Sequence, residues 1–210
     1  ATWDRVEKWA VDIMKRNNIE YFDGPGEAAF YAPKMDLIAT DALGREWQLS
    51  TVQIDFVMPE RFGLEYTAAD GTKKRPVMLH RAIVGSPERF MMIMLEHFAG
   101  AFPLWLSPVQ TKIIPITDAQ HKYAHKILDK LKEQGIRVEI DDRSEKMQSK
   151  IRDAQMQKIP YMLIIGGREV ENNQVSIRQR DNQDLGAMDF DKFLKTIKDQ
   201  IKNKSLNLIK

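Results

Sequence analysis

The sequence predicts two successive domains, an α+β domain in residues 1–107 and an α/β domain in residues 108–210. Alternating polar and apolar residues over residues 47–58 are typical of a strand in an antiparallel sheet. After residue 108, apolar runs of strand length alternate with amphipathic helical segments, which predicts a mixed, mostly parallel sheet. A connector bearing Trp and Pro, Leu104–Pro108, separates the two patterns.

Composition narrows the class of protein. With 210 residues, of which 43% are hydrophobic, the chain is long enough for one or two buried cores. The absence of cysteine excludes disulfides and thiolate metal sites. We find no signal peptide or membrane span in the sequence, so we expect a cytoplasmic protein without membrane contact. The chain does not begin with Met, and we interpret it as the middle of a longer protein.

Charge is distributed unevenly along the chain. Residues 1–108 carry 12 Lys+Arg against 15 Asp+Glu, and residues 109–210 carry 20 against 15. This pattern favours nucleic-acid contact mainly through the second domain. Ordinary surface variation would produce the same difference.

The elements of the first domain follow from periodicity and turn residues. We predict a helix over Trp3–Asn17, strands over Ile19–Tyr21, Met35–Ala39 and Trp47–Met58, a hairpin turn at Asp41–Gly44, and a charged hairpin over Glu60–Arg75.

The strand over Trp47–Met58 carries Thr51, Gln53 and Asp55 on one face and apolar residues on the other. Such a polar face borders either a polar cavity or solvent, and periodicity alone favours solvent. Gln48 falls on the apolar face unless a β-bulge intervenes.

The stretch from Pro76 to Phe102 reads as a strand that feeds a helix. Ser86 is a suitable N-cap, Pro87 suits the first helical position, and Glu88 complements the helix dipole. Arg89 is a cation in the first turn, which is explained either by a bound anion such as phosphate or by exposure to solvent or a local carboxylate. Residues 90–95 are apolar on every side, which predicts a buried core helix.

In the second domain, strands and helices alternate. We predict strands over Val109–Ile116, Ile136–Ile140 and Tyr161–Ile165, helices from Thr117 or Asp118 to Gly135, over Ser144–Lys158 and over Asp189–Lys202, and a hairpin that pairs Glu169–Val170 with Val175–Ile177. The fully apolar run Tyr161–Ile165 predicts a central strand.

Several of these segments resemble one family. The words GPGEAAFY at 24–31, REWQLSTVQIDF at 45–56, RPVMLHRAIVGSPERF at 75–90 and FPLWLSPVQ at 102–110 together resemble threonyl-tRNA synthetases. Within them, GSPERF at 85–90 resembles the third signature motif of class II aminoacyl-tRNA synthetases, whose arginine contacts ATP. The resemblance extends from about Asp23 to Lys202.

The resemblance implies a set of site residues in the first domain. Arg89 would be catalytic and would bind ATP, which is used with Mg²⁺, together with Gln48, Thr51 and Ser86. Tyr31 and Gln53 would face the threonine. The first two class II motifs, with a second arginine and the homodimer interface, have no match in this chain.

The family also uses a zinc ion held by one cysteine and two histidines. His80 matches the last of these ligands, although a lone strand histidine is more often a hydrogen-bonded core residue. Without a cysteine the chain does not complete that site, so we expect little or no ordered zinc. His121 and His125 have the spacing of a metal pair on a helix, but an exposed polar face explains them better, and His97 is uninformative.

The second domain resembles the anticodon-binding domain of class II synthetases. By position, Glu169 and Arg178 would read anticodon bases, and Arg143 would flank the anticodon together with Ser144, where the family often has asparagine. Lys150, Arg152 and Lys158 are phosphate candidates or members of a solvated helix face.

Two functions remain open from the sequence. The resemblance implies part of a threonine–tRNA ligase, with ATP, threonine and tRNA(Thr) as partners, in which this chain alone is not competent. The alternative is a stand-alone RNA-binding module without ligase activity.

Overall fold

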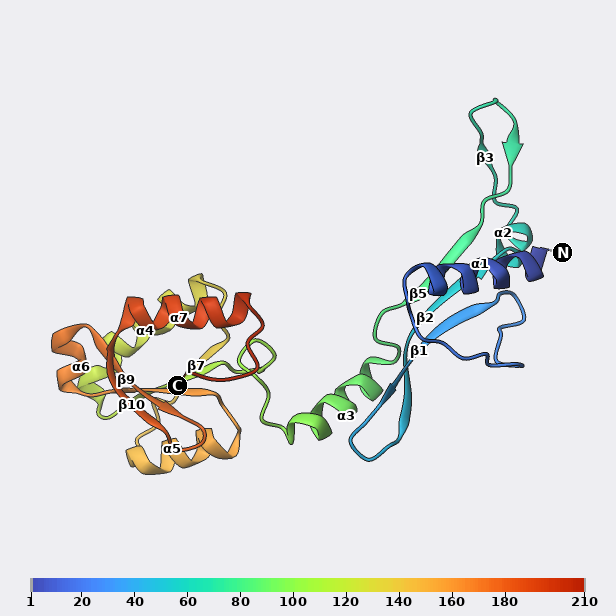
Figure 1. Cartoon of the computed structure of the whole chain (residues 1–210). Helices are drawn as coiled ribbons and strands as arrows, with labels where there is room; N and C mark the ends of the chain where they lie inside the picture. The colour runs from blue at the N-terminus through green and yellow to red at the C-terminus, as the bar shows by residue number, and fades with distance from the viewer. Residues whose placement is uncertain (1, 210) are drawn as a thin grey trace. The chain divides into compact units, whose positions relative to one another are not determined.

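The computed structural model describes residues 2–209, in two compact units that divide between His97 and Phe98 (Figure 1). This division lies ahead of the predicted limit at Ser107, because the connector is bonded to the second unit. Arg137 Nη2 donates to Trp105 O at 2.9 Å, and Gln110 Nε2 donates to Leu104 O at 3.0 Å. The domain limits themselves stay a prediction.

The first unit contains helices α1, α2 and α3 and two separate antiparallel arrangements of strands. The helices are α1 (Thr2–Arg16), α2 (Val57–Arg61) and α3 (Pro87–Phe98), and the strands are β1 (Lys34–Thr40), β2 (Glu46–Asp55), β3 (Tyr66–Thr67), β4 (Lys73–Lys74) and β5 (Met78–Ala82). The main sheet has the order β1-β2-β5, with both pairs antiparallel, and β3 and β4 form a separate two-stranded ribbon. These elements confirm the predicted α+β class.

The prediction of a core helix over residues 90–95 is wrong. No residue of α3 is buried, and the side chains of Met91 and Leu95 are 58% and 51% exposed. The reason is that α3 and the sheet present more apolar surface than the other described elements of the unit cover. Among residues 2–97, the buried apolar side chains are only those of Val6, Ala32, Pro33 and Pro59.

The second unit has helices on both faces of one sheet (Figure 1). The strands are β6 (Thr111–Pro115), β7 (Val138–Ile140), β8 (Tyr161–Ile165), β9 (Gln174–Gln179) and β10 (Asp184–Asp189), and the helices are η1 (Asp118–Gln120), α4 (His121–Glu133), α5 (Met147–Met156), α6 (Gly167–Asn172) and α7 (Phe190–Lys202). The order is β10-β9-β8-β6-β7; β6, β7 and β8 are parallel, and β9 is antiparallel to both of its neighbours. The predicted mixed sheet is confirmed, with β8 in its centre.

Alternation along the strands gives this sheet two buried faces. On β8, Leu163 points into the larger core with residues of α4 and α7, whereas Met162 and Ile164 point into a smaller core with Ile151 of α5. The unit therefore has a core of its own, unlike the first unit.

Several element predictions need correction. Gly167–Asn172 is helix α6 and not the first arm of a hairpin, because the Glu169 carboxylate accepts the Gly166 N–H at 2.9 Å as a helix cap does. The strand that forms the hairpin with β9 is instead β10. The sequence did not indicate β10 because Gly186 and polar residues interrupt the strand pattern there. Ile19–Tyr21 is not a strand, and β2 ends at Asp55, which accepts the N–H groups of α2.

None of the helices in the described range 2–209 combines the length and the apolar character that a membrane crossing requires.

Candidate functional site

Strand register places the predicted substrate residues of the first unit on one face of the sheet. Lys34, Gln53 and His80 are successive partners across β1, β2 and β5, and Asp36, Thr51 and Ala82 form the next row. Because residues two apart on a strand share a face, the two rows form one continuous polar surface. The sheet therefore brings together side chains from three separate segments.

A β-bulge brings Gln48 to the same face. Leu37 pairs with Ser50 but Ile38 pairs with Gln48, so Leu49 is the extra residue of β2. A single inserted residue shifts the following side chains to the opposite face. Gln48 therefore lies on the polar face, as the sequence analysis allowed if a β-bulge intervened.

Asp36 lies in the middle of this polar surface and was not predicted as a site residue. Burial raises the pKa of its carboxyl group, but Lys34, Thr51 and Gln48 together lower the pKa below its usual range. Lys34 Nζ donates to Asp36 Oδ2 at 2.5 Å, whereas Oδ1 of Asp36 and Oγ1 of Thr51 are buried without a hydrogen-bond partner of ordinary geometry. The sequence did contain a sign of this position. Lys34 and Asp36 are spaced two apart in β1, opposite Thr51 and Gln53, which are spaced two apart in β2.

Arg89 lies at the start of α3, beside this sheet. Ser86 caps the helix as predicted, since its hydroxyl accepts the Arg89 N–H at 3.4 Å, and it also donates to Glu88 at 2.6 Å. Gly85 has φ +68°, and a Cβ added there would lie 2.6 Å from the oxygen of Leu49 and 3.1 Å from Arg89 Nη2. The Arg89 side chain therefore approaches the bulge of β2, and its buried Nε has no hydrogen-bond partner.

The residues predicted to face threonine also meet. Tyr31 donates a hydrogen bond to Gln53 Oε1 at 2.9 Å, and its ring lies 5.4 Å from that of His80. His80 Nε2 lies 2.8 Å from Asp55 Oδ2, and the Asp55 side chain is 0% exposed. Burial raises the pKa of Asp55, but the N–H groups of Met58 and Val57 and the imidazole of His80 lower it overall. Asp55 thus orients His80, a role that alternation alone did not reveal.

The family's zinc ion does not fit the residues described here. His80 is engaged through Nε2 by Asp55, and residues 2–209 contain no group of three His, Asp or Glu side chains arranged to hold a metal ion. Zinc in proteins requires three or four protein ligands. His121 and His125 face different carboxylates, Asp118 at 3.6 Å and Asp142 at 3.8 Å.

In the second unit, the two predicted base readers lie at different levels of the sheet. Glu169 is on α6, which follows the carboxyl end of β8, and one of its oxygens caps that helix. Arg178 pairs with Met162 near the amino end of β8 and forms an ion pair with Asp184 at 3.0 Å. The structure does not bring these two side chains into contact.

Arg143 is held by two carboxylates. Its guanidinium donates to both oxygens of Asp141, at 2.8 and 2.6 Å, and to Asp153 at 2.8 Å. The Arg143 guanidinium lowers the pKa of Asp141 below its usual range, and the two carboxylates raise the pKa of Arg143. These carboxylates and the neighbouring residues line a hollow beside β7, and Arg143 is the only predicted RNA contact among them.

Both interpretations of Lys150, as a phosphate contact and as part of a solvated helix face, are wrong because the residue is buried. Its side chain is directed at the sheet, the residue is 3% exposed, and Nζ donates to Pro115 O at 3.3 Å. Arg152 and Lys158 are exposed as expected.

The ion pair of Asp141 predicts a specific loss of stability in acid. Because the folded-state pKa of Asp141 is lowered, its contribution is present above the unfolded value of about 3.9 and is lost as the pH falls through the folded-state pKa. Arg143→Ala is expected to weaken this acid dependence. Amide hydrogen exchange of β7 and α5 across this pH range measures it, with Arg152→Ala as control; equal profiles for both variants would contradict the assignment.

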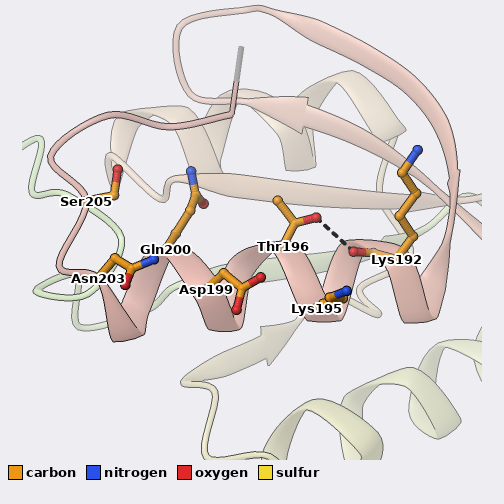
Figure 2. A pocket seen from close by; sticks show the side chains of 7 residues that line it. All are labelled: Lys192, Lys195, Thr196, Asp199, Gln200, Asn203 and Ser205. Atoms are coloured by element: carbon orange, nitrogen blue, oxygen red, sulfur yellow. Dashed lines mark hydrogen bonds between the residues drawn. The ribbon is translucent and has the colours of Figure 1, made fainter.

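A second hollow runs along the outer face of α7 (Figure 2). Its lining residues are Lys192, Lys195, Thr196, Asp199, Gln200, Asn203 and Ser205. The one hydrogen bond drawn joins Thr196 Oγ1 to the backbone oxygen of Lys192 at 2.9 Å. No predicted site residue lies there, so we assign it no role.

Comparison with known proteins defines the class of protein first. Residues 4–98 match the family model of the tRNA synthetase class II core domain (G, H, P, S and T), and residues 110–200 match that of the anticodon binding domain. The two matches correspond to the two compact units.

Individual relatives narrow the class. The chain is 52% identical over 204 residues to the threonine–tRNA ligase of Caldanaerobacter subterraneus subsp. tengcongensis and 55% identical over 203 residues to that of Clostridium botulinum, covering 97% of this chain and 32% of each relative. The RNA binding domain of threonyl-tRNA synthetase from Cryptosporidium parvum Iowa II matches with TM-score 0.84 and 33% identity, over 94% of this chain and 50% of that one. The chain belongs to the threonyl-tRNA synthetase family and corresponds to its C-terminal part. It spans about a third of the length of the curated relatives it matches.

Proposed function

We propose that this chain is part of a threonine–tRNA ligase, in which the first unit contributes to threonyl-adenylate formation and the second unit reads the anticodon. The observation that carries the proposal is the polar face of the sheet β1-β2-β5, which gathers the residues expected to contact amino acid and nucleotide. Its register supports the proposal because it brings Lys34, Gln53 and His80, from three separate segments, onto one face.

The row containing Gln53 is the amino-acid half of the proposed site. The hydrogen bond from Tyr31 fixes the Gln53 carbonyl oxygen, so the amide N–H₂ group of Gln53 is left to donate to the substrate. A closed site with such uncharged polar groups favours a substrate that satisfies them and penalises an analogue without the hydroxyl. Such groups would favour threonine over valine, which lacks the hydroxyl.

The row containing Thr51 is the nucleotide half. Gln48 and Thr51 lie on the polar face, and Arg89 provides a guanidinium beside it. In adenylate formation the carboxylate of the amino acid attacks the α-phosphate of ATP, pyrophosphate leaves, and negative charge develops on the phosphate oxygens. A fixed cation at that position lowers the barrier, and Mg²⁺ bound with ATP would neutralise the departing pyrophosphate. The contact of Ser86 with ATP also stays a prediction.

The complete reaction needs more than this chain. The motif-two arginine, the remaining zinc ligands and the homodimer interface of the family have no counterpart in residues 1–210. We therefore expect no threonine-dependent ATP–pyrophosphate exchange by the chain alone and robust exchange by the complete ligase. Exchange by the isolated chain would contradict this division of the site. We propose a cytoplasmic location on the basis of the substrate tRNA(Thr).

The proposed reading of the anticodon by the second unit rests on contacts between charged side chains and base edges. Threonine anticodons carry guanine in the middle, whose Watson–Crick edge offers two adjacent N–H donors to a carboxylate such as that of Glu169. Arg178 offers donors for base oxygens once its pairing with Asp184 opens. Arg143 is proposed to flank the anticodon, and its two carboxylate partners fix its guanidinium.

We expect the chain to bind a threonine anticodon stem-loop more tightly than one with its middle base changed. A well-made base contact contributes about 1–3 kcal/mol, or about 5- to 150-fold. Replacing both proposed readers, by Glu169→Gln together with Arg178→Ala, should erase this ratio, whereas Arg152→Ala should weaken binding to both stem-loops equally, as loss of a phosphate contact does. Titrations of the unchanged chain and of each variant with both stem-loops, at one fixed salt concentration, measure these affinities. Equal binding of both stem-loops by the unchanged chain would exclude the reading.

A stand-alone RNA-binding module is the second candidate. It is favoured by the difference between the units, since the described residues of the first unit bury only a few small apolar side chains and form no hydrophobic cluster of the kind that the second unit has twice. If this candidate is right, stem-loop binding persists when Arg89 and Gln53 are replaced, and no ligase activity is found in any longer product of the gene.

A further inference from the structure

The two halves of the proposed site are joined by an ion pair. Lys34 belongs to the row of Gln53 and His80, and Asp36 belongs to the row of Thr51. Lys34 Nζ lies 2.5 Å from Asp36 Oδ2. The pair therefore spans the boundary at which a threonine carboxylate and an α-phosphate would meet.

Burial makes this pair different from an ordinary surface ion pair. The side chains of Lys34 and Asp36 are only 15% and 17% exposed. Ion pairs that are partly removed from water are screened less than exposed ones, so their geometry is more strongly fixed. Another carboxylate, that of Glu27, lies 4.0 Å from Lys34 Nζ but is 76% exposed. Asp36 is therefore the group that fixes the ammonium.

The other oxygen of Asp36 points to the nucleotide half. Oδ1 and the hydroxyl oxygen of its register partner Thr51 are buried and form no hydrogen bond of ordinary geometry, although Thr51 and Gln48 lie close enough to lower the pKa of the Asp36 carboxyl group. A buried polar atom left unpaired is costly, and such atoms are concentrated where a function requires them. A small rotation of the Thr51 hydroxyl group toward Asp36 would orient its lone pairs to accept from a ligand.

We propose that Asp36 is a positioning residue of the adenylation site: its carboxylate holds the Lys34 ammonium at the boundary between the two halves. Two anions, the threonine carboxylate and the α-phosphate, have to approach each other there, and a fixed cation reduces their repulsion. This inference rests on the proposed function. It adds a role for a carboxylate that does not itself contact the reacting atoms.

The test is a double-mutant cycle in the complete ligase, measured by threonine-dependent ATP–pyrophosphate exchange. Asp36→Asn keeps the shape of the side chain and removes its charge. We expect kcat to fall about 100-fold, the size of effect that a misplaced group produces, with less change in the KM for ATP. Asp36→Glu should recover part of the rate, and Glu27→Gln should leave it unchanged.

Coupling separates positioning from a merely structural role. If Asp36 acts through Lys34, Asp36→Asn in a Lys34→Met background should cost little more than Lys34→Met alone. Additive losses in kcat, or full activity of Asp36→Asn, would overturn the inference. Thermal unfolding of each variant checks that the fold is intact. If the unchanged ligase shows no threonine-dependent exchange, the proposed function itself fails, and that result is distinct from an active enzyme that is insensitive to Asp36.

Discussion

Replacing Arg89 by alanine in the complete ligase is expected to lower the rate of adenylate formation by about 100- to 1,000-fold, as loss of one preorganised charge-stabilising group does. The guanidinium lies at the first turn of α3, next to the bulge of β2, and its buried Nε is unpaired. An unpaired buried guanidinium nitrogen is costly for the fold alone, so a bound anion is the more economical explanation of this arrangement.

Two further variants make the Arg89 result specific. Arg89→Lys retains the charge but not the planar set of donors, so we expect an intermediate rate. Arg81 pairs with Val52 on the opposite face of the same sheet, and Arg81→Ala should keep the rate close to that of the unchanged enzyme. Unchanged pyrophosphate exchange in Arg89→Ala would refute the proposed role.

Gly85→Ala is expected to be nearly as damaging, although it adds a single methyl group. A Cβ at this position would lie 2.6 Å from Leu49 O, a backbone atom that does not move freely, and 3.1 Å from Arg89 Nη2. In addition, the φ of +68° costs a residue with a Cβ about 1–2 kcal/mol. Relief of the clash has to displace either the bulge or Arg89, and a shift of about 1 Å in a positioned group costs about 100-fold in rate.

Gly63→Ala is the matched control for this effect. Gly63 has φ +62°, and an added Cβ there meets nothing within 4 Å. This variant carries the conformational cost without the clash, so it should lose a little stability and retain its rate. Exchange kinetics and thermal unfolding of both variants distinguish the two contributions. If Gly63→Ala and Gly85→Ala lose activity equally, strain and not the approach of Arg89 to β2 explains the glycine.

Some features were predictable from the sequence because they depend on neighbouring residues. The cap formed by Ser86, the start of α3 at Pro87 and the central strand Tyr161–Ile165 follow from local preferences and from continuous apolar runs. The β10 strand was missed because it is defined by its pairing with β9, whereas helix α6 was missed although its cap, from Glu169 to Gly166, is local.

Periodicity alone could not decide whether the polar face of β2 borders solvent or a cavity. A strand with alternating residues is compatible with either, and only pairing with β1 and β5 shows that Lys34, Asp36 and His80 extend the same face. The position of Gln48 depends on one extra residue, Leu49, and β-bulges have no reliable mark in a single sequence. The role of the buried Asp55 likewise became apparent only from its contact with His80.

The sequence by itself determined the family, the two domain types and the identity of most candidate site residues, because these depend on residue types in a fixed order. The tertiary structure alone decided which of those side chains meet, that Asp36 pairs with Lys34, and that α3 is exposed in this chain. The physical reason is that register, bulges and burial are set by contacts between segments far apart in the sequence, and local preferences carry no information about such contacts.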